Sequence, residues 1–200
     1  MRKRVYISSD YSEDHGDLDV VEELMRFAQD QRFSLNFIDM AQVASGSISE
    51  DNNDCRPCEL KKEFNEQINA SSAVIFVVGD RTAIRTAGSN CYRGSKEWFQ
   101  CNCTPYKQNT NGSKLCKVQT EISSGNDVSI INTCSYLEHE FKQAVKKGKK
   151  IIILYNAKIK MESWLPAYMS DYRNVAHPFW IENIGGGRRG DYVYLKQELL

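Results

Sequence analysis

The segment Ser135–Asn156, SYLEHEFKQAVKKGKKIIILYN, predicts a helix that stops at a glycine and leads into a buried strand. Apolar residues at helical spacing form a single stripe, made of Leu137, Phe141, Ala144 and Val145. Gly148 follows two lysines, which is a typical pattern at the C-terminus of a helix. The apolar run 151–154 is typical of a strand that is covered on both faces. The segment therefore predicts one helix–strand unit of an α/β protein.

Titratable side chains crowd the first turn of this helix, namely Glu138, His139 and Glu140. With about 100° of rotation per residue, the two glutamates lie at opposite edges of the apolar stripe, and His139 is expected to face solvent. Acidic residues are also common in the first turn of a helix because the helix dipole favours them there. Helical spacing alone therefore assigns neither glutamate a role.

Composition narrows the class of protein. The chain has 200 residues, enough for a single domain with a proper core, and its formal net charge is zero. A neutral chain gives no sign of nucleic-acid binding, and no apolar run approaches the length of a membrane span. Because residues 1–10 do not have the pattern of a signal peptide, we expect a cytoplasmic protein with its seven cysteines reduced.

Three more strands are expected, at Val5–Ile7, Phe33–Ile38 and Ala73–Val78, with a helix between each consecutive pair. The first helix spans residues 17–31, and the second begins at Pro57, after a long polar loop over residues 41–56. Strands that alternate with helices favour right-handed crossovers and a doubly wound parallel sheet of about five strands.

The C-terminal part contains several short segments. Residues 163–166 predict a short helix or turn, and Val175–Ile181 a fifth strand, which Pro178 would restrict to an edge of the sheet. The glycine-rich stretch Gly185–Gly190 is expected to be a flexible basic loop, and residues 191–195 a further strand. The glycines have neither P-loop nor GxGxxG spacing, so we expect no phosphate-binding role for them.

A parallel sheet also predicts where a ligand would bind. Ligands of such sheets lie beyond the carboxyl ends of the strands, where the next helices begin. Four polar segments occupy that position, namely Ser8–Asp10, Asp39, Gly79–Asp80 and the turn Tyr136–Glu140. We therefore expect them to face one crevice.

A long insertion, residues 81–133, separates the third strand from the helix that carries Glu140. Loops of this length are uncommon in compact domains and are often functional lids. Between residues 81 and 117 there are seven lysines and arginines against one acidic residue, Glu97. The insertion is therefore either a lid over a phosphate-bearing ligand or a solvated basic segment.

Three blocks of sequence resemble TIR and TIR-like domains. Val5–Tyr11 is similar to the first-strand motif of that family, and Val74–Thr82 to its central strand with the following Gly-x-x-Thr. Tyr136–Phe141 resembles the Trp-x-x-x-Glu helix, and Gly148 follows Glu140 by eight positions. The likeness covers residues 3–85 and 134–156 of a single domain, 1–200. It is strongest to the TIR-like NAD-consuming subunit of bacterial Thoeris anti-phage defence systems.

This resemblance implies a flavodoxin-like fold and cleavage of NAD, as substrate and not as cofactor, at the nicotinamide–ribose bond. It implies Glu140 as the catalytic residue. The residues implied to bind substrate are Ser8, Ser9, Asp10, Tyr11, Asp39, Thr82 and Tyr136. A carboxylate beside the ribose suits this chemistry, because loss of nicotinamide leaves an oxocarbenium-like sugar.

The resemblance also implies partners. The product, linear or cyclic ADP-ribose or a derivative of it, would reach a nucleotide-sensing effector protein, and a phage-derived activator and a homo-oligomer are further partners to test. Two differences from the family are Tyr136 in place of its tryptophan and the insertion before the helix. The alternatives are a non-catalytic TIR-type interaction module and a nucleoside-processing transferase, which would also use a glutamate beside a ribose.

The cysteines offer a separate hypothesis. Zinc sites prefer paired thiolates with short spacers, and the insertion contains Cys91, Cys101, Cys103 and Cys116. Cys55 and Cys58 form the only CxxC pair. Because the insertion has a CxC pair and no CxxC, reduced cysteines without a shared role are favoured over a structural zinc, and no metal is expected.

Overall fold

The computed structural model describes residues 3–10, 16–29, 35–39, 56–85, 106–108, 114–116 and 135–200. The main sheet contains five parallel strands, which are β1 (Lys3–Ser8), β2 (Leu35–Asp39), β3 (Ala73–Val78), β6 (Lys150–Tyr155) and β7 (His177–Pro178). Their order is β2-β1-β3-β6-β7. This is the strand order of the flavodoxin-like fold, so the expected doubly wound α/β architecture is confirmed.

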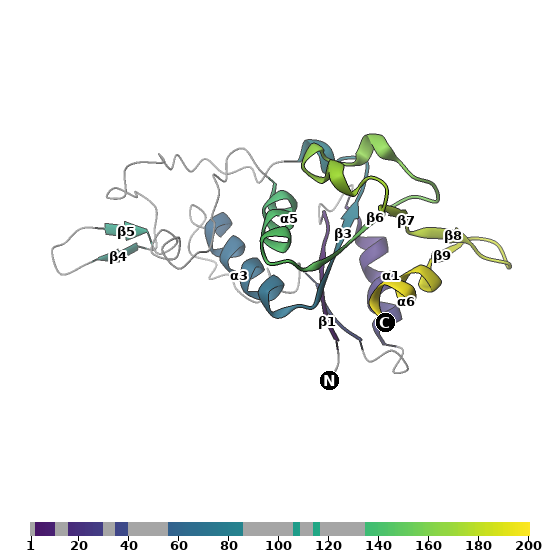
Figure 1. Cartoon of the computed structure of the whole chain (residues 1–200), viewed down its shortest axis with the longest axis horizontal. Helices are drawn as coiled ribbons and strands as arrows, with labels where there is room; N and C mark the ends of the chain where they lie inside the picture. Colours follow the sequence, from purple (N-terminus) through teal and green to yellow (C-terminus); the bar gives the residue numbers. More distant parts are fainter. Residues whose placement is uncertain are drawn as a thin grey trace.

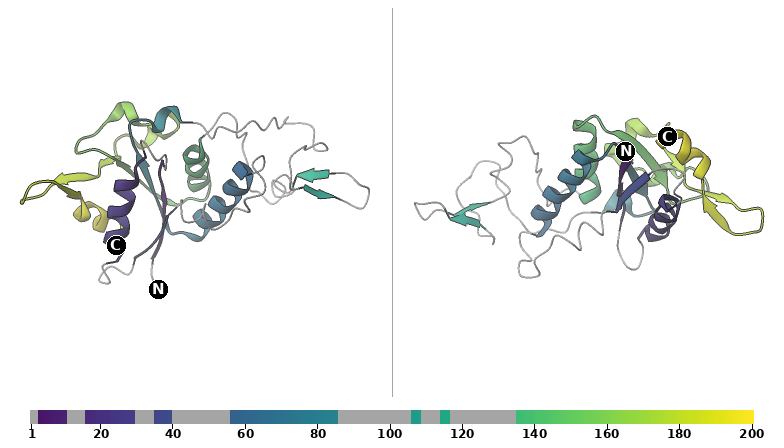
Figure 2. Two further views of the ribbon diagram at one scale, coloured as in Figure 1. Left: turned by 180° about the vertical axis from the view of Figure 1, so that it is seen from behind. Right: turned by 90° about the horizontal axis from the view of Figure 1, so that it is seen from below.

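Helices cover both faces of the sheet (Figure 1). The four α-helices of the described residues are α1 (Leu18–Ala28), α3 (Arg56–Ala70), α5 (Tyr136–Lys146) and α6 (Tyr192–Leu199). Figure 2 shows α3 and α5 together on one face, and α1 and α6 on the other. Strand β1 serves both faces in alternation, because Val5 and Ile7 join the core beneath α1 whereas Tyr6 joins the core beneath α3 and α5.

Local sequence determines both ends of α5. Ser135 caps the first turn, because its side chain accepts a hydrogen bond of 2.9 Å from the backbone N–H of Glu138. At the other end Gly148 has a φ of 59°, and its N–H donates to the carbonyl of Val145 while Lys149 N–H donates to that of Ala144. This pair of bonds is a Schellman motif, so the predicted glycine stop is confirmed.

The C-terminal part corrects three predictions. Only His177–Pro178 of the expected fifth strand joins the sheet, and Pro178 does lie on an edge strand. The chain then forms an antiparallel pair, β8 (Trp180–Glu182) with β9 (Arg188–Gly190), so part of the predicted flexible loop is a strand. The strand expected at residues 191–195 is wrong, because α6 occupies that stretch. Asp191 caps α6 by accepting from Tyr194 N–H at 3.1 Å, and Leu195 and Leu199 bury one helix face.

Shorter elements complete the described residues. Turns of 3-10 helix occur at η2 (Thr82–Ile84), η3 (Glu162–Trp164) and η4 (Ala167–Tyr172), and η3 confirms the short helix expected there. Within the insertion, β4 (Tyr106–Gln108) and β5 (Lys114–Cys116) pair antiparallel. None of the helices in the described ranges is long and apolar enough to span a membrane.

Candidate functional site

Glu140 lies where α3, α5 and β1 meet, and none of its surface is exposed. Its carboxyl group faces the hydroxyl groups of Tyr6 and Ser8 on β1, both of which are buried as well. Ser8 is the last residue of β1 and is paired with Phe76 of β3. The carboxyl group is therefore near the carboxyl ends of the first and third strands, where flavodoxin-like sheets bind ligands.

The carboxyl group of Glu140 is poorly compensated for its burial. Among the described residues, no hydrogen bond of normal geometry reaches Oε1 or Oε2, and Ser8 Oγ lacks one too. Burial raises the pKa of Glu140 to about 8, although the nearby Ser8 and Tyr6 hydroxyls lower it somewhat. A buried carboxyl without full hydrogen bonding destabilises a fold, so its presence at the rim of a parallel sheet points to a ligand-binding role.

Two helices determine this burial. Helix α3 lies over β1, where Arg4 donates to Gln67 and where Phe64 packs with Tyr6 in one core. Helix α5 packs beside α3 (Figure 1), and the carboxyl group of Glu140 on α5 faces Ser8 and Tyr6 of β1. A helix position at the edge of an apolar stripe becomes fully buried when a second helix closes that edge.

His139 corrects a prediction, because it does not face solvent. It is 2% exposed, and its Nε2 lies 3.0 Å from Asn65 Oδ1 on α3. One turn later Gln143 Nε2 donates to Asn69 Oδ1 at 2.9 Å, so polar pairs join the two helices at consecutive turns. The spacing of α5 identified its sheet-facing stripe but gave no sign that α3 would cover a second side.

Two other residues of the first turn have contacts with neighbouring side chains. Glu138 forms an ion pair with Lys142 at 2.6 Å on the outer side of α5. Tyr136 is half-buried, and its ring meets that of Phe64 edge to face at a centroid distance of 5.8 Å. Tyr136 therefore closes the seam between α3 and α5 one turn before Glu140.

Two further predicted residues have structural partners. Asp10 is paired with Arg85 at 2.6 Å, which joins the ends of the β1 and β3 segments. Thr82 is 4% exposed, and its Oγ1 accepts from Gly79 N–H at 2.8 Å, which shapes the turn after β3. Ser9 is buried, and its Oγ has no partner among the described residues. The structure thus brings Ser8, Ser9 and Glu140 to one rim.

Several predicted residues lie outside what the structure describes. Tyr11 belongs to the segment 11–15, and Asp39 is placed only through its backbone, at the end of β2 and opposite Ile7. Of the cysteines proposed for zinc, Cys116 ends β5, while Cys91, Cys101 and Cys103 are outside the described residues. The residues that the structure does describe include no group of three or more potential metal ligands. The zinc hypothesis stays a prediction.

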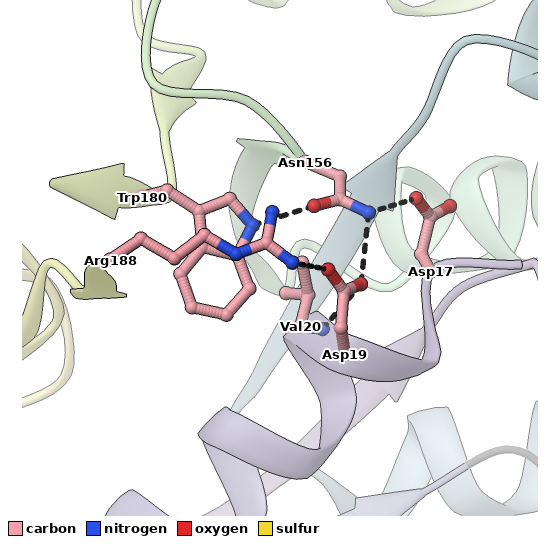
Figure 3. A network of polar contacts seen from close by, with 6 residues as sticks. All are labelled: Asp17, Asp19, Val20, Asn156, Trp180 and Arg188. Atoms are coloured by element: carbon pink, nitrogen blue, oxygen red, sulfur yellow. Dashed lines mark hydrogen bonds and ion pairs between the residues drawn. The ribbon is translucent and has the colours of Figure 1, made fainter.

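A second polar cluster lies at the rim (Figure 3), and the sequence did not predict it. Asn156, just after β6, donates from Nδ2 to Asp17 at 2.9 Å and to Asp19 at 3.0 Å, and its Oδ1 accepts from Trp180 Nε1 at 2.6 Å. Arg188 lies over the Trp180 ring, 4.1 Å from its centroid, and pairs with Asp19. These residues lie on β8 and β9, at the start of α1 and just after β6, and no local pattern links them.

Asp17 is the buried acid of this cluster. Burial raises its pKa to about 6, and the Asn156 hydrogen bond opposes that rise, whereas the negative charges of Asp10, Asp19 and Asp80 add to it. Its carboxylate touches Gly79, where a Cβ atom would lie 2.5 Å from Asp17 Oδ1. Glycine at this position therefore allows α1 to begin directly against the end of β3.

Comparison of the sequence with models of known protein families finds no match, and no curated protein matches it either. A carboxyl group that is neutral when buried alone becomes an acceptor when a ligand brings hydroxyl groups or positive charge.

Proposed function

We propose that the protein is a TIR-like enzyme that cleaves NAD at the bond between nicotinamide and ribose. The observation that carries this proposal is the buried Glu140 carboxyl group, which adjoins the Ser8 and Tyr6 hydroxyls but receives no hydrogen bond of normal geometry from the described residues. The likeness of Val5–Tyr11, Val74–Thr82 and Tyr136–Phe141 to TIR-domain motifs supports the same reading. Ser8, Ser9 and Tyr136 would line the substrate site.

The reaction follows from the charges. The bond from ribose C1′ to the ring nitrogen breaks, its electron pair goes to nicotinamide, and the ring leaves as a neutral molecule. The sugar acquires oxocarbenium character, which the ionised Glu140 carboxylate would stabilise. Water then adds to C1′ and loses a proton to give ADP-ribose, or an internal nucleophile adds to give a cyclic isomer. No second carboxylic acid is required, because the leaving group is already cationic.

The biological role belongs to the same proposal. An ADP-ribose-derived product would be a nucleotide signal that activates an effector protein, as the likeness to Thoeris anti-phage systems implies. Activity would then depend on a trigger that appears during phage infection. Assays should therefore be run with and without extract of phage-infected cells.

The test measures nicotinamide release by chromatography and mass spectrometry, for wild type and for Glu140→Gln. Removing the carboxylate should lower kcat/KM by roughly 100- to 1,000-fold, since it acts on charge that develops in the transition state. Glu138→Gln is the matched control, because Glu138 is paired with Lys142 and should leave turnover unchanged. Wild-type kcat/KM should also rise with pH towards about 8, because only the ionised Glu140 acts.

Three other outcomes would contradict this proposal, in whole or in part. Equal turnover by Glu140→Gln would assign the reaction to another residue. No turnover by wild type, even with infected-cell extract, would favour a TIR-type interaction module. Release of free base from deoxynucleosides in place of NAD would favour a nucleoside-processing transferase. The mass of the NAD-derived product distinguishes hydrolysis from cyclisation.

A further inference from the structure

The seam between α3 and α5 contains a second buried group without a partner. Asn65, on α3, is 1% exposed, and its Oδ1 lies 3.0 Å from His139 Nε2. Because a carbonyl oxygen has no proton to give, His139 is the donor in this bond. The other end of the amide, Nδ2, has no hydrogen-bond partner among the described residues.

The neighbouring polar pair shows what a purely structural contact between these helices looks like. Asn69 and Gln143 lie one turn further along α3 and α5, and there the amide of Gln143 donates to Asn69 at 2.9 Å. Asn69 is exposed, so water can serve its remaining groups. Nδ2 of Asn65 is out of reach of solvent, and an unpaired buried N–H destabilises a fold. The Asn69–Gln143 pair shows that the two helices can be joined without an unpaired buried donor such as Asn65 Nδ2.

The unpaired groups of this seam are complementary to one another. Glu140 offers two acceptor oxygens, Ser8 offers a hydroxyl that both donates and accepts, and Asn65 offers a donor. All three are buried, and they lie on α5, β1 and α3, which meet on one face of the sheet. A sugar ring matches this set, because each of its hydroxyl groups can donate to a carboxylate and accept from an amide.

We propose that Asn65 belongs to the Glu140 site and that its amide donates a hydrogen bond to a ribose hydroxyl of the substrate. This inference rests on the proposed function, because it takes the nicotinamide-bearing ribose as the ligand of Glu140. His139 is a positioning residue in it. By donating to Oδ1, His139 holds the amide so that Nδ2 is the end left for the ligand.

The first test uses the free protein and needs no substrate. The Glu140 carboxyl is titrated by carbon-13 NMR in wild type, in Asn65→Asp and in Asn69→Asp. Two carboxyls in one buried pocket titrate as a coupled pair, so Asn65→Asp should move the apparent pKa of Glu140 by about one unit or more. Asn69→Asp should leave it unchanged. An unchanged Glu140 titration in Asn65→Asp overturns the proposal.

The second test uses turnover. Asn65→Ala should lower kcat/KM for NAD by about tenfold, as expected for one lost hydrogen bond to the substrate, and Asn69→Ala should not. Both variants remove one contact between the helices, so their melting temperatures show how much of any loss is structural. Wild type should cleave an NAD analogue that lacks the 2′-hydroxyl on the nicotinamide-bearing ribose with a lower kcat/KM than NAD. For Asn65→Ala the kcat/KM values of the analogue and of NAD should differ little, because this variant has already lost the hydrogen bond to that hydroxyl. The 3′-deoxy analogue tests the other hydroxyl in the same way.

The two arms separate this inference from the proposed function. If removing the Asn65 amide and removing either ribose hydroxyl lower kcat/KM independently of one another, the contact between Asn65 and ribose is overturned. The proposal that the protein cleaves NAD would still stand. Absence of nicotinamide release by wild type would overturn the proposed function and the ribose contact together. In that case the titration still decides whether Asn65 and Glu140 share one pocket.

Discussion

At the scale of single residues, the environment of a side chain decides its chemistry more than its type does. Glu138 and Glu140 are two positions apart on one helix, yet Glu138 is paired with Lys142 while Glu140 is fully buried. The sequence identified both as edge positions, but it could not rank them by helical spacing. Only packing against α3 and β1 places one of them out of reach of water.

The pH dependence of stability is one prediction at this scale. Burial raises the pKa of Glu140 from 4.5 to about 8 in the folded state, so the folded protein binds this proton more tightly than the unfolded chain does. The contribution of this bound proton to the free energy of unfolding is complete below about pH 4.5 and is lost as pH rises through about 8. In Glu140→Gln the buried side chain is an amide, which stays neutral at every pH. It should therefore exceed wild type in free energy of unfolding at pH 9 by about 3–5 kcal/mol, and by little at pH 5.

Urea unfolding of both proteins at pH 5 and pH 9 measures this difference. Glu138→Gln is again the matched control and should follow wild type at both values. Equal stability of Glu140→Gln and wild type at pH 9 would mean that Glu140 is hydrated in solution, which would contradict its burial.

At the scale of elements, α5 agreed with its local signals and α6 did not. Helix α5 has the glycine stop that its sequence predicts, and Leu137, Phe141 and Ala144 of the predicted stripe are buried. Val145 corrects the prediction, because it is 47% exposed at the edge of the stripe. The stretch that forms α6 was expected to be a strand, since its short alternation of aromatic and aliphatic residues fits either structure. Asp191 as a cap, and burial of Leu195 and Leu199 against the sheet, decide in favour of the helix.

The cap of α5 gives a prediction at this scale. Ser135 is 6% exposed and satisfies the N–H of Glu138, so Ser135→Ala should lower the free energy of unfolding by about 1 kcal/mol. Ser135→Asp keeps an acceptor at the same position and should lose less. Chemical denaturation of the three proteins at pH 7 tests this. If the aspartate variant were as unstable as the alanine variant, the capping bond would not be what Ser135 contributes.

At the scale of the whole molecule, the rim is held together by contacts between residues far apart in the chain. Asn156 joins the start of α1 to Trp180 on β8, through bonds to Asp17 and Asp19. The Asn156 amide also opposes the burial that raises the pKa of Asp17. Asn156 therefore couples the first and last thirds of the chain to the end of the central sheet.

Replacing Asn156 tests this coupling. Asn156→Ala should lower the free energy of unfolding by about 2–4 kcal/mol at pH 8, because it leaves the buried Asp17 carboxylate without its donor. Asp17 has a folded pKa that is raised to about 6, so protonation removes most of that penalty at pH 5 and the loss there should be smaller. Arg188→Ala is the comparison, because Arg188 is half exposed and should contribute under about 1 kcal/mol.

Guanidinium unfolding at the two pH values, followed by tryptophan fluorescence, measures both variants. A loss for Asn156→Ala that is equal at pH 5 and pH 8 would show that Asp17 stays hydrated. A loss as large for Arg188→Ala as for Asn156→Ala would move the main contribution to the exposed ion pair.

The sequence by itself determined the α/β class, the parallel sheet, the C-terminal end of α5 and the rim that carries Ser8 and Glu140. Periodicity, capping and glycine stops act over a few residues, and a fully apolar strand such as β3 reports burial on both faces without further information. These signals are local, so they can be read along the chain.

Only the tertiary structure decided which polar groups are buried together. Glu140 meets Ser8, His139 meets Asn65, and Asn156 meets Asp17 across separations that no sequence period encodes. Whether a carboxyl ionises depends on the water that remains around it, and neighbouring helices remove that water only when the chain packs. For this reason the rim could be located from the sequence, whereas the chemistry of its side chains required the packed fold.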